Sequence, residues 1–406
     1  MRMQLWLKIL IALVLGVIAG LLLGKTASDQ SVFLGKLIWA VGTIFLNLIK
    51  MVIVPLVFAS LVAGAASISD IRKLGRIGGK TIVYFLATTA FAIIIGLILG
   101  NIIKPGLGLT VEAPAGATTT AQTANWLDTI VAIFPTNPID AMVKAQMLPI
   151  IVFALFVGAS ISLAGKVAEP VGVFFNSFAE VMYKMITGIM TFAPFGVFAL
   201  IAAVVGKYGP DVLLPFAKLI ITVYIGCILH MLLVYAPTVV ASAKMSPVKF
   251  FKEAAPAMIL AFSTASSSAT LPVSMKVTEE GLGVKKDIAS FVLPLGATIN
   301  MDGTALYQGV CALFIAQFFG IEFSLTQQAM VVLTATLASI GTAGVPGAGM
   351  VMLSMVLASV GLPLEGVAII AGVDRILDMM RTMVNITGDI ACSVFVAATE
   401  GELTKK

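Results

Sequence analysis

Charged side chains are scarce in this chain. Asp, Glu, Lys and Arg make up 11% of its 406 residues and apolar residues 59%, with a mean hydropathy of +1.08. Soluble domains carry roughly 25% charged residues. The scarcity excludes an ordinary soluble protein and indicates an all-α polytopic membrane protein. The net charge of +5 comes from basic residues in short segments between apolar runs, which excludes a nucleic-acid-binding surface and indicates membrane topology.

Histidine and cysteine are also scarce. The single histidine, His230, lies in an apolar run, so a His-ligated metal site or a Ser–His pair is excluded, and we expect a satisfied polar residue within a helix. The cysteines are widely spaced in apolar segments, which is typical of small core residues and not of a disulfide framework: Cys227, Cys311 and Cys392.

No pattern of an enzyme stands out. The serines at 266–268 lack a base, and Thr387-Gly388-Asp389 only faintly resembles an intramembrane aspartyl protease signature, which needs a second facing carboxylate. We therefore expect no enzyme and no organic cofactor.

Long apolar runs predict the membrane-spanning helices. They cover residues 6–23, 32–66, 81–103, 126–164 with an interruption, 171–205, 211–241, 289–318 and 362–398. The densest early basic cluster lies at 69–80, whereas the segment 105–125 holds no Lys or Arg. By the positive-inside rule, both termini are expected in the cytoplasm, with the chain in the inner or plasma membrane.

Two further apolar stretches, 254–277 and 328–362, must enter and leave on the same side for this topology to close. The first contains Ser-Thr-Ala-Ser-Ser-Ser-Ala-Thr-Leu-Pro at 263–272, and the second contains Ser-Ile-Gly-Thr-Ala-Gly-Val-Pro-Gly-Ala-Gly at 339–349. Backbone freed by Gly, Pro and Ser is tolerated at membrane depth only where it is buried or lines a cavity. We predict two re-entrant helical hairpins in inverted repeats, with a binding site near the midplane.

A polar stripe lies inside the last apolar run. At 100° per helical residue, its five members fall within an arc of about 80°: Asp374, Asp378, Arg381, Asn385 and Asp389. Each lone charge in hydrocarbon costs at least ~2.5–3.5 kcal/mol, so the stripe must face protein, ions or water. The stripe predicts a functional site; the alternative is a structural seam between helices.

Oxygen ligands for a cation are present near this stripe. Asn-Met-Asp-Gly-Thr at 300–304 breaks the run 289–318, and its freed carbonyls with Asp302 and Asp389 suit an alkali cation. Thr88 and Thr89 add hydroxyls, although adjacent threonines in a helix are also a common packing pair. Asp302, Asp378 and Asp389 with Arg381 carry a formal charge of −2. An anionic ligand would therefore require about three cations, or protonated carboxylates.

These motifs resemble a known family. The matching segments are 50–68, the serines 266–268, the motif at 300–304, the tip at 339–349 and Asp-Met-Met-Arg-Thr-Met-Val-Asn-Ile-Thr-Gly-Asp at 378–389. Together they resemble the dicarboxylate/amino acid:cation symporter family, in particular glutamate/aspartate transporters of the prokaryotic type. The resemblance implies eight transmembrane helices plus two re-entrant hairpins, the glutamate-transporter fold, and a homotrimer working by an elevator mechanism.

The resemblance also implies a division of the chain. Residues 1–80 (helices 1–2) and 120–206 (helices 4–5) would form a scaffold. Residues 81–104 (helix 3) and 211–406 would form the transport core, with helix 6, hairpin 1 at 250–278, helix 7, hairpin 2 at 326–362 and helix 8.

Site residues follow from the same resemblance, position by position. Arg381 matches the partner of the substrate's side-chain carboxylate and Asp378 the acceptor of its ammonium. Further substrate contacts would come from Thr382, Asn385, Ser267, Thr304, Val345 and Gly349. One sodium site would use Asp389 with Gly296, Asn300 and Asn385, a second Thr298, Ser339, Ile340 and Thr342, and a third Phe85, Thr88, Thr89, Asn300 and Asp302.

Arg381 and Asp378 together indicate an acidic amino acid, L-aspartate or L-glutamate, and Asp302 with Asp389 favours sodium over protons. The alternatives are a proton-coupled or C4-dicarboxylate symporter of the same family, or an anion-conducting channel. The chain departs from many relatives at Ala265 and Met379, where one of the two positions often holds an arginine. Arg375, one turn before Met379, would substitute for that arginine in the charge balance.

Overall fold

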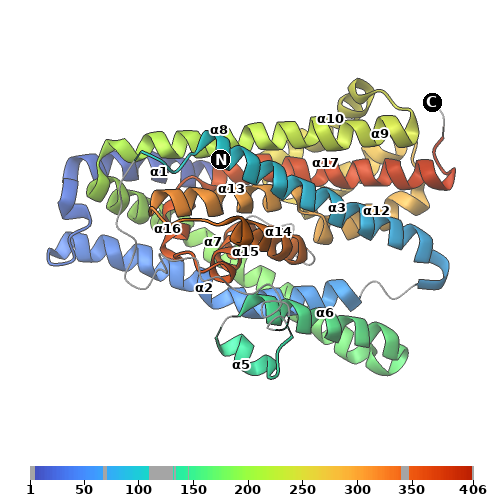
Figure 1. Cartoon of the computed structure of the whole chain (residues 1–406), viewed down its shortest axis with the longest axis horizontal. Helices are drawn as coiled ribbons and strands as arrows, with labels where there is room; N and C mark the ends of the chain where they lie inside the picture. The colour runs from blue at the N-terminus through green and yellow to red at the C-terminus, as the bar shows by residue number, and fades with distance from the viewer. Residues whose placement is uncertain are drawn as a thin grey trace.

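The computed structural model describes residues 5–66, 71–108, 131, 134–144, 146–339 and 347–404. This part of the chain is almost entirely helical, and most of its long helices run along the long axis of the molecule (Figure 1). The only strand-like pairing among the described residues is an isolated antiparallel bridge between Val284 and Leu403.

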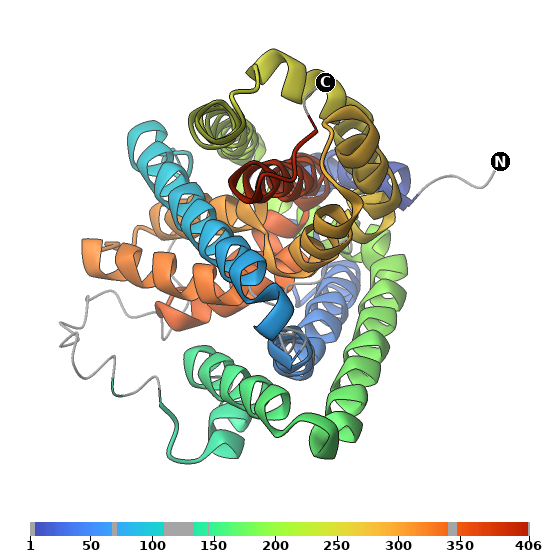
Figure 2. The same cartoon turned by 90° about the vertical axis from the view of Figure 1, so that its right-hand side faces the viewer.

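The N-terminal half supplies one packed group of helices. It consists of α1 (Leu5–Leu23), α2 (Phe33–Ala66), α6 (Met147–Ala164) and α7 (Glu169–Tyr208), with the short α5 (Pro138–Val143) beside α6. Small residues permit the closest approach: a Cβ at Gly16 would lie 2.8 Å from the Phe198 carbonyl oxygen, so α1 can rest directly on α7. In Figure 2, α2, α6 and α7 lie on one side of the molecule, away from α17.

The C-terminal half surrounds α17 (Asp374–Glu400), which lies in the interior (Figure 2). This helix contacts α3 (Ile71–Ile103), α8 (Leu213–His230), α9 (Ala236–Ala243), α10 (Pro247–Thr264), α11 (Ser267–Lys276), α12 (Lys286–Ile299) and α13 (Asp302–Phe318). A helix covered on all sides can keep polar groups away from lipid, which is what its charged stripe requires.

Each segment predicted as a hairpin contains a pair of packed helices. In the first, α10 and α11 are joined at Ala265 and Ser266; Ala265 has a left-handed backbone (φ 51°), and the Ser266 hydroxyl accepts a hydrogen bond from the Ala269 amide. In the second, α14 (Leu325–Ser339) and α15 (Ala348–Ser359) pack against each other. The segment 340–346 between them lies outside the described residues.

The break in the run 289–318 is where the sequence predicts it, since α12 ends at Ile299 and α13 begins at Asp302. Two other predicted runs differ from the structure, and a third contains an irregular turn. Helix α3 begins at Ile71, so most of the basic segment 69–80 is helical. The run 362–398 contains two helices, α16 (Glu365–Ala371) and α17, and the run 211–241 contains a π-helical turn, Met231–Tyr235. Lys and Arg are good helix formers, so a basic segment can extend the helix that follows it.

Six helical segments of the described chain are long and apolar enough to cross a membrane. They are Leu7–Ala27, Arg76–Ile103, Val152–Met182, Thr191–Tyr208, Pro210–Ala243 and Asp374–Glu400. The protein is a multi-pass helical membrane protein, as composition predicts.

Candidate functional site

The polar stripe of α17 is buried along its whole length. Its five residues are between 0% and 6% exposed, and Arg381 is completely covered. Asp374 begins the helix, where the positive end of the helix dipole favours a carboxylate. The stripe therefore faces protein rather than lipid, which confirms the sequence-based expectation.

Arg381 is the centre of the stripe. Its Nη1 donates to Asp374 Oδ1 and its Nη2 to Asp378 Oδ1, each at 2.8 Å. The guanidinium lies 3.9 Å from the centre of the Tyr307 ring, a cation–π distance. A Cβ at Gly349 would lie 2.7 Å from Arg381 Nη2, so α15 can approach the guanidinium only because this residue is glycine. The arrangement holds a fixed positive charge with donors left over for a ligand.

Asn385 joins α17 to the break before α13. Its Oδ1 accepts from the Gly303 amide at 2.8 Å, and its Nδ2 donates to the Thr304 hydroxyl at 3.3 Å. Thr304 is buried at 6% exposure, and Thr382 is buried one residue beyond Arg381. The structure thus brings Thr304, Thr382 and Asn385 to the Arg381 region, as expected of residues that share a site.

Asp302 is the most heavily hydrogen-bonded carboxylate of the site. Its Oδ1 accepts from the Thr89 hydroxyl at 2.6 Å, and its Oδ2 accepts from the Tyr235 hydroxyl at 2.7 Å. His230 Nε2 lies 3.1 Å from the same Oδ2. No sequence pattern indicated Tyr235, and His230 was expected only as a satisfied polar residue. One ring nitrogen meets that expectation, but Nδ1 is buried without a partner in the described part of the chain.

Asp389 lies beside Asn300 and Gly296. Asn300 Nδ2 donates to Asp389 Oδ1 at 3.0 Å and to the Asn385 carbonyl at 3.3 Å. The Oδ1 of Asn300 is buried and has no partner among the described residues. A Cβ at Gly296 would lie 2.6 Å from Asp389 Cγ and 3.0 Å from the Phe85 ring. Asn300 Nδ2 thus lies between two oxygens, Asp389 Oδ1 and the Asn385 carbonyl, and both are of the kind that binds hard cations.

The remaining predicted residues are less closely grouped. Thr88 donates to the Phe85 carbonyl at 3.2 Å, the packing behaviour considered above. Ser267 is buried at the start of α11. Thr298 is exposed and donates to the Leu295 carbonyl, whereas Ser339 is buried and donates to the Thr336 carbonyl. Ile340, Thr342 and Val345 lie outside the described residues.

Arg375 lies off the stripe by helical angle, yet its side chain reaches the site. Its Nη2 donates to the Thr264 carbonyl at the end of α10 at 3.2 Å, and its Nη1 lies 4.0 Å from Asp378 Oδ2. The angle alone suggested a side chain pointing away from the stripe, which the contact with Asp378 corrects. A long flexible side chain covers more than its Cβ direction indicates. Arg375 thus puts a positive charge beside the first hairpin tip, near Ala265.

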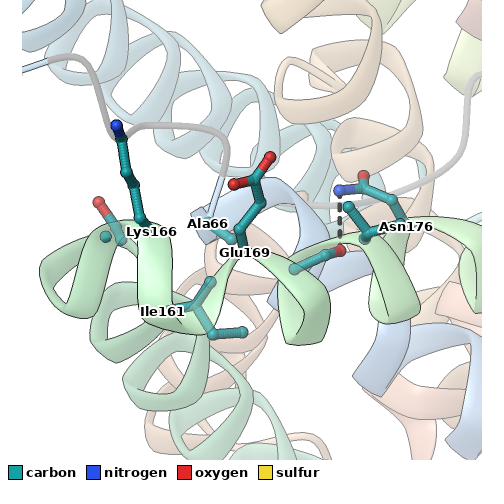
Figure 3. Close-up of a pocket in the computed structure, with 9 residues that line it drawn as sticks. Ala66, Ile161, Lys166, Glu169 and Asn176 are labelled. Atoms are coloured by element: carbon teal, nitrogen blue, oxygen red, sulfur yellow. Dashed lines mark hydrogen bonds between the residues drawn. The ribbon is translucent and has the colours of Figure 1, made fainter.

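The larger cavities lie elsewhere. One of about 300 Å³ lies where α6 meets α7, and Lys166, Glu169 and Asn176 line it with Ala66 and Ile161 (Figure 3). Another, of about 540 Å³, lies between α2, α7 and α16. A small cavity of about 10 Å³, room for about one water, borders Asp374, Arg375 and Asp378.

Buried charges, a broken helix and two packed helix pairs indicate a class of protein. Discontinuous helices around a charged midplane site are the architecture of secondary transporters, not of enzymes. The chain belongs to the sodium:dicarboxylate symporter family, whose family model matches residues 5–399. It is a member of a transporter family and not an enzyme.

Relatives cover the whole chain. It is 40% identical over 415 aligned positions to the proton/sodium-glutamate symport protein of Geobacillus stearothermophilus, which covers 98% of this chain and 95% of that protein. It is 40% identical over 410 positions to the proton/glutamate-aspartate symporter of Escherichia coli (98% and 93%). It is 34% identical over 409 positions to C4-dicarboxylate transport protein 1 of Ralstonia nicotianae (99% and 93%). These findings confirm the resemblance seen in the motifs.

Proposed function

We propose that this protein is a secondary active transporter that carries L-aspartate or L-glutamate into the cell together with sodium ions. The observation that carries the proposal is the position of Arg381 between Asp374 and Asp378, next to a cluster of cation-ligand oxygens. The Arg381 guanidinium would bind the side-chain carboxylate of an acidic amino acid, and the nearby Asp378 carboxylate would bind its ammonium.

Recognition would use the donors that Arg381 has left. A guanidinium has five N–H groups, and two of them donate to Asp374 and Asp378; Nε is buried without a partner among the described residues. A ligand carboxylate can take the remaining donors in a bidentate pair. The ligand ammonium would pair with Asp378, whose Oδ2 accepts from the Gly347 amide at 3.4 Å and lies 4.0 Å from Arg375 Nη1.

Charge balance supports cation coupling. The site contains four buried carboxylates and the two guanidiniums of Arg375 and Arg381, which leaves a formal charge of −2. The carboxylates are those of Asp302, Asp374, Asp378 and Asp389. An acidic amino acid adds a further negative charge, which a low-dielectric site cannot hold uncompensated. About three sodium ions per protomer would restore neutrality.

Sodium sites would form around Asp389 and Asp302. The first would use Asp389 with oxygens of Gly296, Asn300 and Asn385. The third would use Asp302 with Phe85, Thr88, Thr89 and Asn300. The hydrogen bonds from Thr89 to Asp302 and from Asn300 to Asp389 support these two groupings. The second, at Thr298 and Ser339, rests on the family resemblance.

A proton-coupled symporter is the principal second candidate, and one observation favours it. His230 Nε2 contacts Asp302 Oδ2, so one oxygen of the proposed third sodium site already has a side-chain partner in place of a metal ion. The relatives' names include both proton and sodium coupling. A C4-dicarboxylate substrate has no ammonium and would leave Asp378 without its partner.

Transport would proceed by an elevator movement in a homotrimer. Helices α1, α2, α6 and α7 would be the static scaffold, and α3 with the chain from α8 onward the moving core. The close packing of α1 and α2 on α7 supports this division. Both termini would lie in the cytoplasm.

Uptake into proteoliposomes tests the proposal. We expect labelled aspartate or glutamate to accumulate with an inward sodium gradient and not in choline buffer without a proton gradient, while succinate competes poorly. Asp389→Asn should raise the sodium concentration needed for half-maximal uptake about 10- to 100-fold, the range for losing support of a metal site. Equal uptake in sodium-free choline buffer, or transport of succinate in preference to aspartate, would contradict it.

A further inference from the structure

Three helices that carry the candidate cation ligands are tied together at one end. Glu400, the last residue of α17, forms ion pairs with Arg76 and Lys80 of α3; its Oε1 is 2.6 Å from Lys80 Nζ. The Glu400 side chain is only 5% exposed, whereas Arg76 is 77% exposed. Lys80 also donates to the Thr399 hydroxyl at 3.0 Å. The carboxylate of Glu400 is therefore the buried member of this group.

The segment that follows α17 reaches a third helix. Gly401 turns the chain with a left-handed backbone (φ 71°), and Thr404 then donates from its amide to the Gly283 carbonyl at 2.8 Å. The Lys285 amide donates to the Glu402 carbonyl at 3.3 Å, just before α12 begins at Lys286. We call the Glu400 ion pairs and this backbone bridge the C-terminal clamp.

The helices held by the clamp run from it toward the cation ligands. On α3, Lys80 is followed by Tyr84 and Thr88 at four-residue spacing, and Tyr84 stacks on Phe395 of α17 with ring centres 5.2 Å apart. Eight residues separate Lys80 from Thr88, which is about 12 Å of helix. If α3 rotated or slid against α17 at the clamp, the candidate cation ligands about 12 Å further along α3 would move as well.

We propose that Glu400 is a positioning residue for cation coupling: it sets the register of α3 against α17 and so the spacing of the oxygens that bind the coupling ions. Metal sites depend on such outer groups because ligand oxygens must be held at defined distances. The inference rests on the proposed sodium coupling, and it concerns Glu400, a residue that is not itself a proposed ligand of the ions.

The test compares Glu400→Gln with Glu402→Gln. Both changes remove one negative charge from the same segment, but Glu402 pairs with the exposed Lys285 and its backbone makes the bridge to α12. Aspartate binding to the purified full-length protein is measured over a sodium titration and again at saturating sodium. For Glu400→Gln we expect the half-saturating sodium concentration to rise about 3- to 10-fold, less than for loss of a direct partner of a ligand. Aspartate affinity at saturating sodium should stay within twofold of wild type.

Glu402→Gln should stay within twofold of wild type in both measurements. The charge exchange Lys80→Glu with Glu400→Lys should recover part of the sodium affinity, and it serves as the informative variant if Glu400→Gln does not fold. Unchanged sodium affinity in Glu400→Gln, an equal shift in Glu402→Gln, or lost aspartate affinity at saturating sodium would each overturn the inference. A wild-type protein without sodium dependence would overturn the proposed function itself, and the inference with it.

Discussion

The hydroxyl of Thr89 on α3 donates a hydrogen bond of 2.6 Å to the carboxylate of Asp302 at the start of α13. These residues are 213 positions apart in the chain, and both are fully buried. The bond connects α3, which we propose to be part of the transport core, with the break between α12 and α13. It also directs one oxygen of Asp302 toward the hydroxyl and backbone groups that would complete a cation site.

Thr89→Val should weaken sodium binding, because it removes that hydroxyl while keeping the side-chain shape. Loss of one hydrogen bond to a charged group costs about 1.5–3 kcal/mol, which corresponds to roughly 10- to 100-fold in sodium affinity. The measurement is the sodium dependence of aspartate binding. Thr81→Val on the same helix is the matched control, since its hydroxyl donates to the Ile77 carbonyl. Equal effects of the two changes would show that Thr89 acts only through the packing of α3.

Arg381→Lys should abolish high-affinity binding of acidic amino acids although it keeps the positive charge. A lysine can neither donate to Asp374 and Asp378 in the present geometry nor bind a carboxylate with two parallel hydrogen bonds. Breaking a buried charge pair costs about 3–5 kcal/mol, or more than roughly 100-fold in affinity. Calorimetric titration with aspartate at saturating sodium measures it, with thermal unfolding to confirm the fold. Retained wild-type affinity in a folded variant would refute the role of Arg381.

Asp378→Asn should change the substrate preference. The amide keeps the shape of the carboxylate but loses the charge that would pair with an ammonium, so aspartate affinity should fall about 100-fold while competition by succinate falls much less. Competition of each compound against labelled aspartate, or direct uptake, gives the ratio. A parallel fall for both compounds would mean that Asp378 supports Arg381 and does not recognise the ammonium.

Gly296→Ala should displace the Asp389 carboxylate from its present position. The added methyl group would lie 2.6 Å from Asp389 Cγ and 3.0 Å from the Phe85 ring, so the carboxylate must move. We expect sodium affinity to fall at least about 10-fold, as when support of a metal ligand is lost. Gly188→Ala on α7 is the control, because no atom lies within 4 Å of its added Cβ. An unaltered sodium titration in Gly296→Ala would place the cation elsewhere.

The helical class, the buried stripe and the helix pairs α10–α11 and α14–α15 could be predicted from the sequence alone. The polar stripe of α17 can be predicted from the sequence because helical periodicity is local and because charges in lipid are costly wherever the helix lies. The break at 300–304 can also be predicted from local residue types, since Gly and Asn have low helix propensity.

Contacts between distant segments were decided only by the tertiary structure. Nothing near Asp302 in the chain indicates that Tyr235 and His230 lie beside it, and only the family resemblance grouped Thr89 with it. The contact of Arg375 with Thr264 depends on where α10 ends. The ion pairs of Glu400 with α3 join residues more than 300 positions apart. Local patterns state which groups cannot remain in lipid, but only the packing of helices selects the partners that make their burial stable.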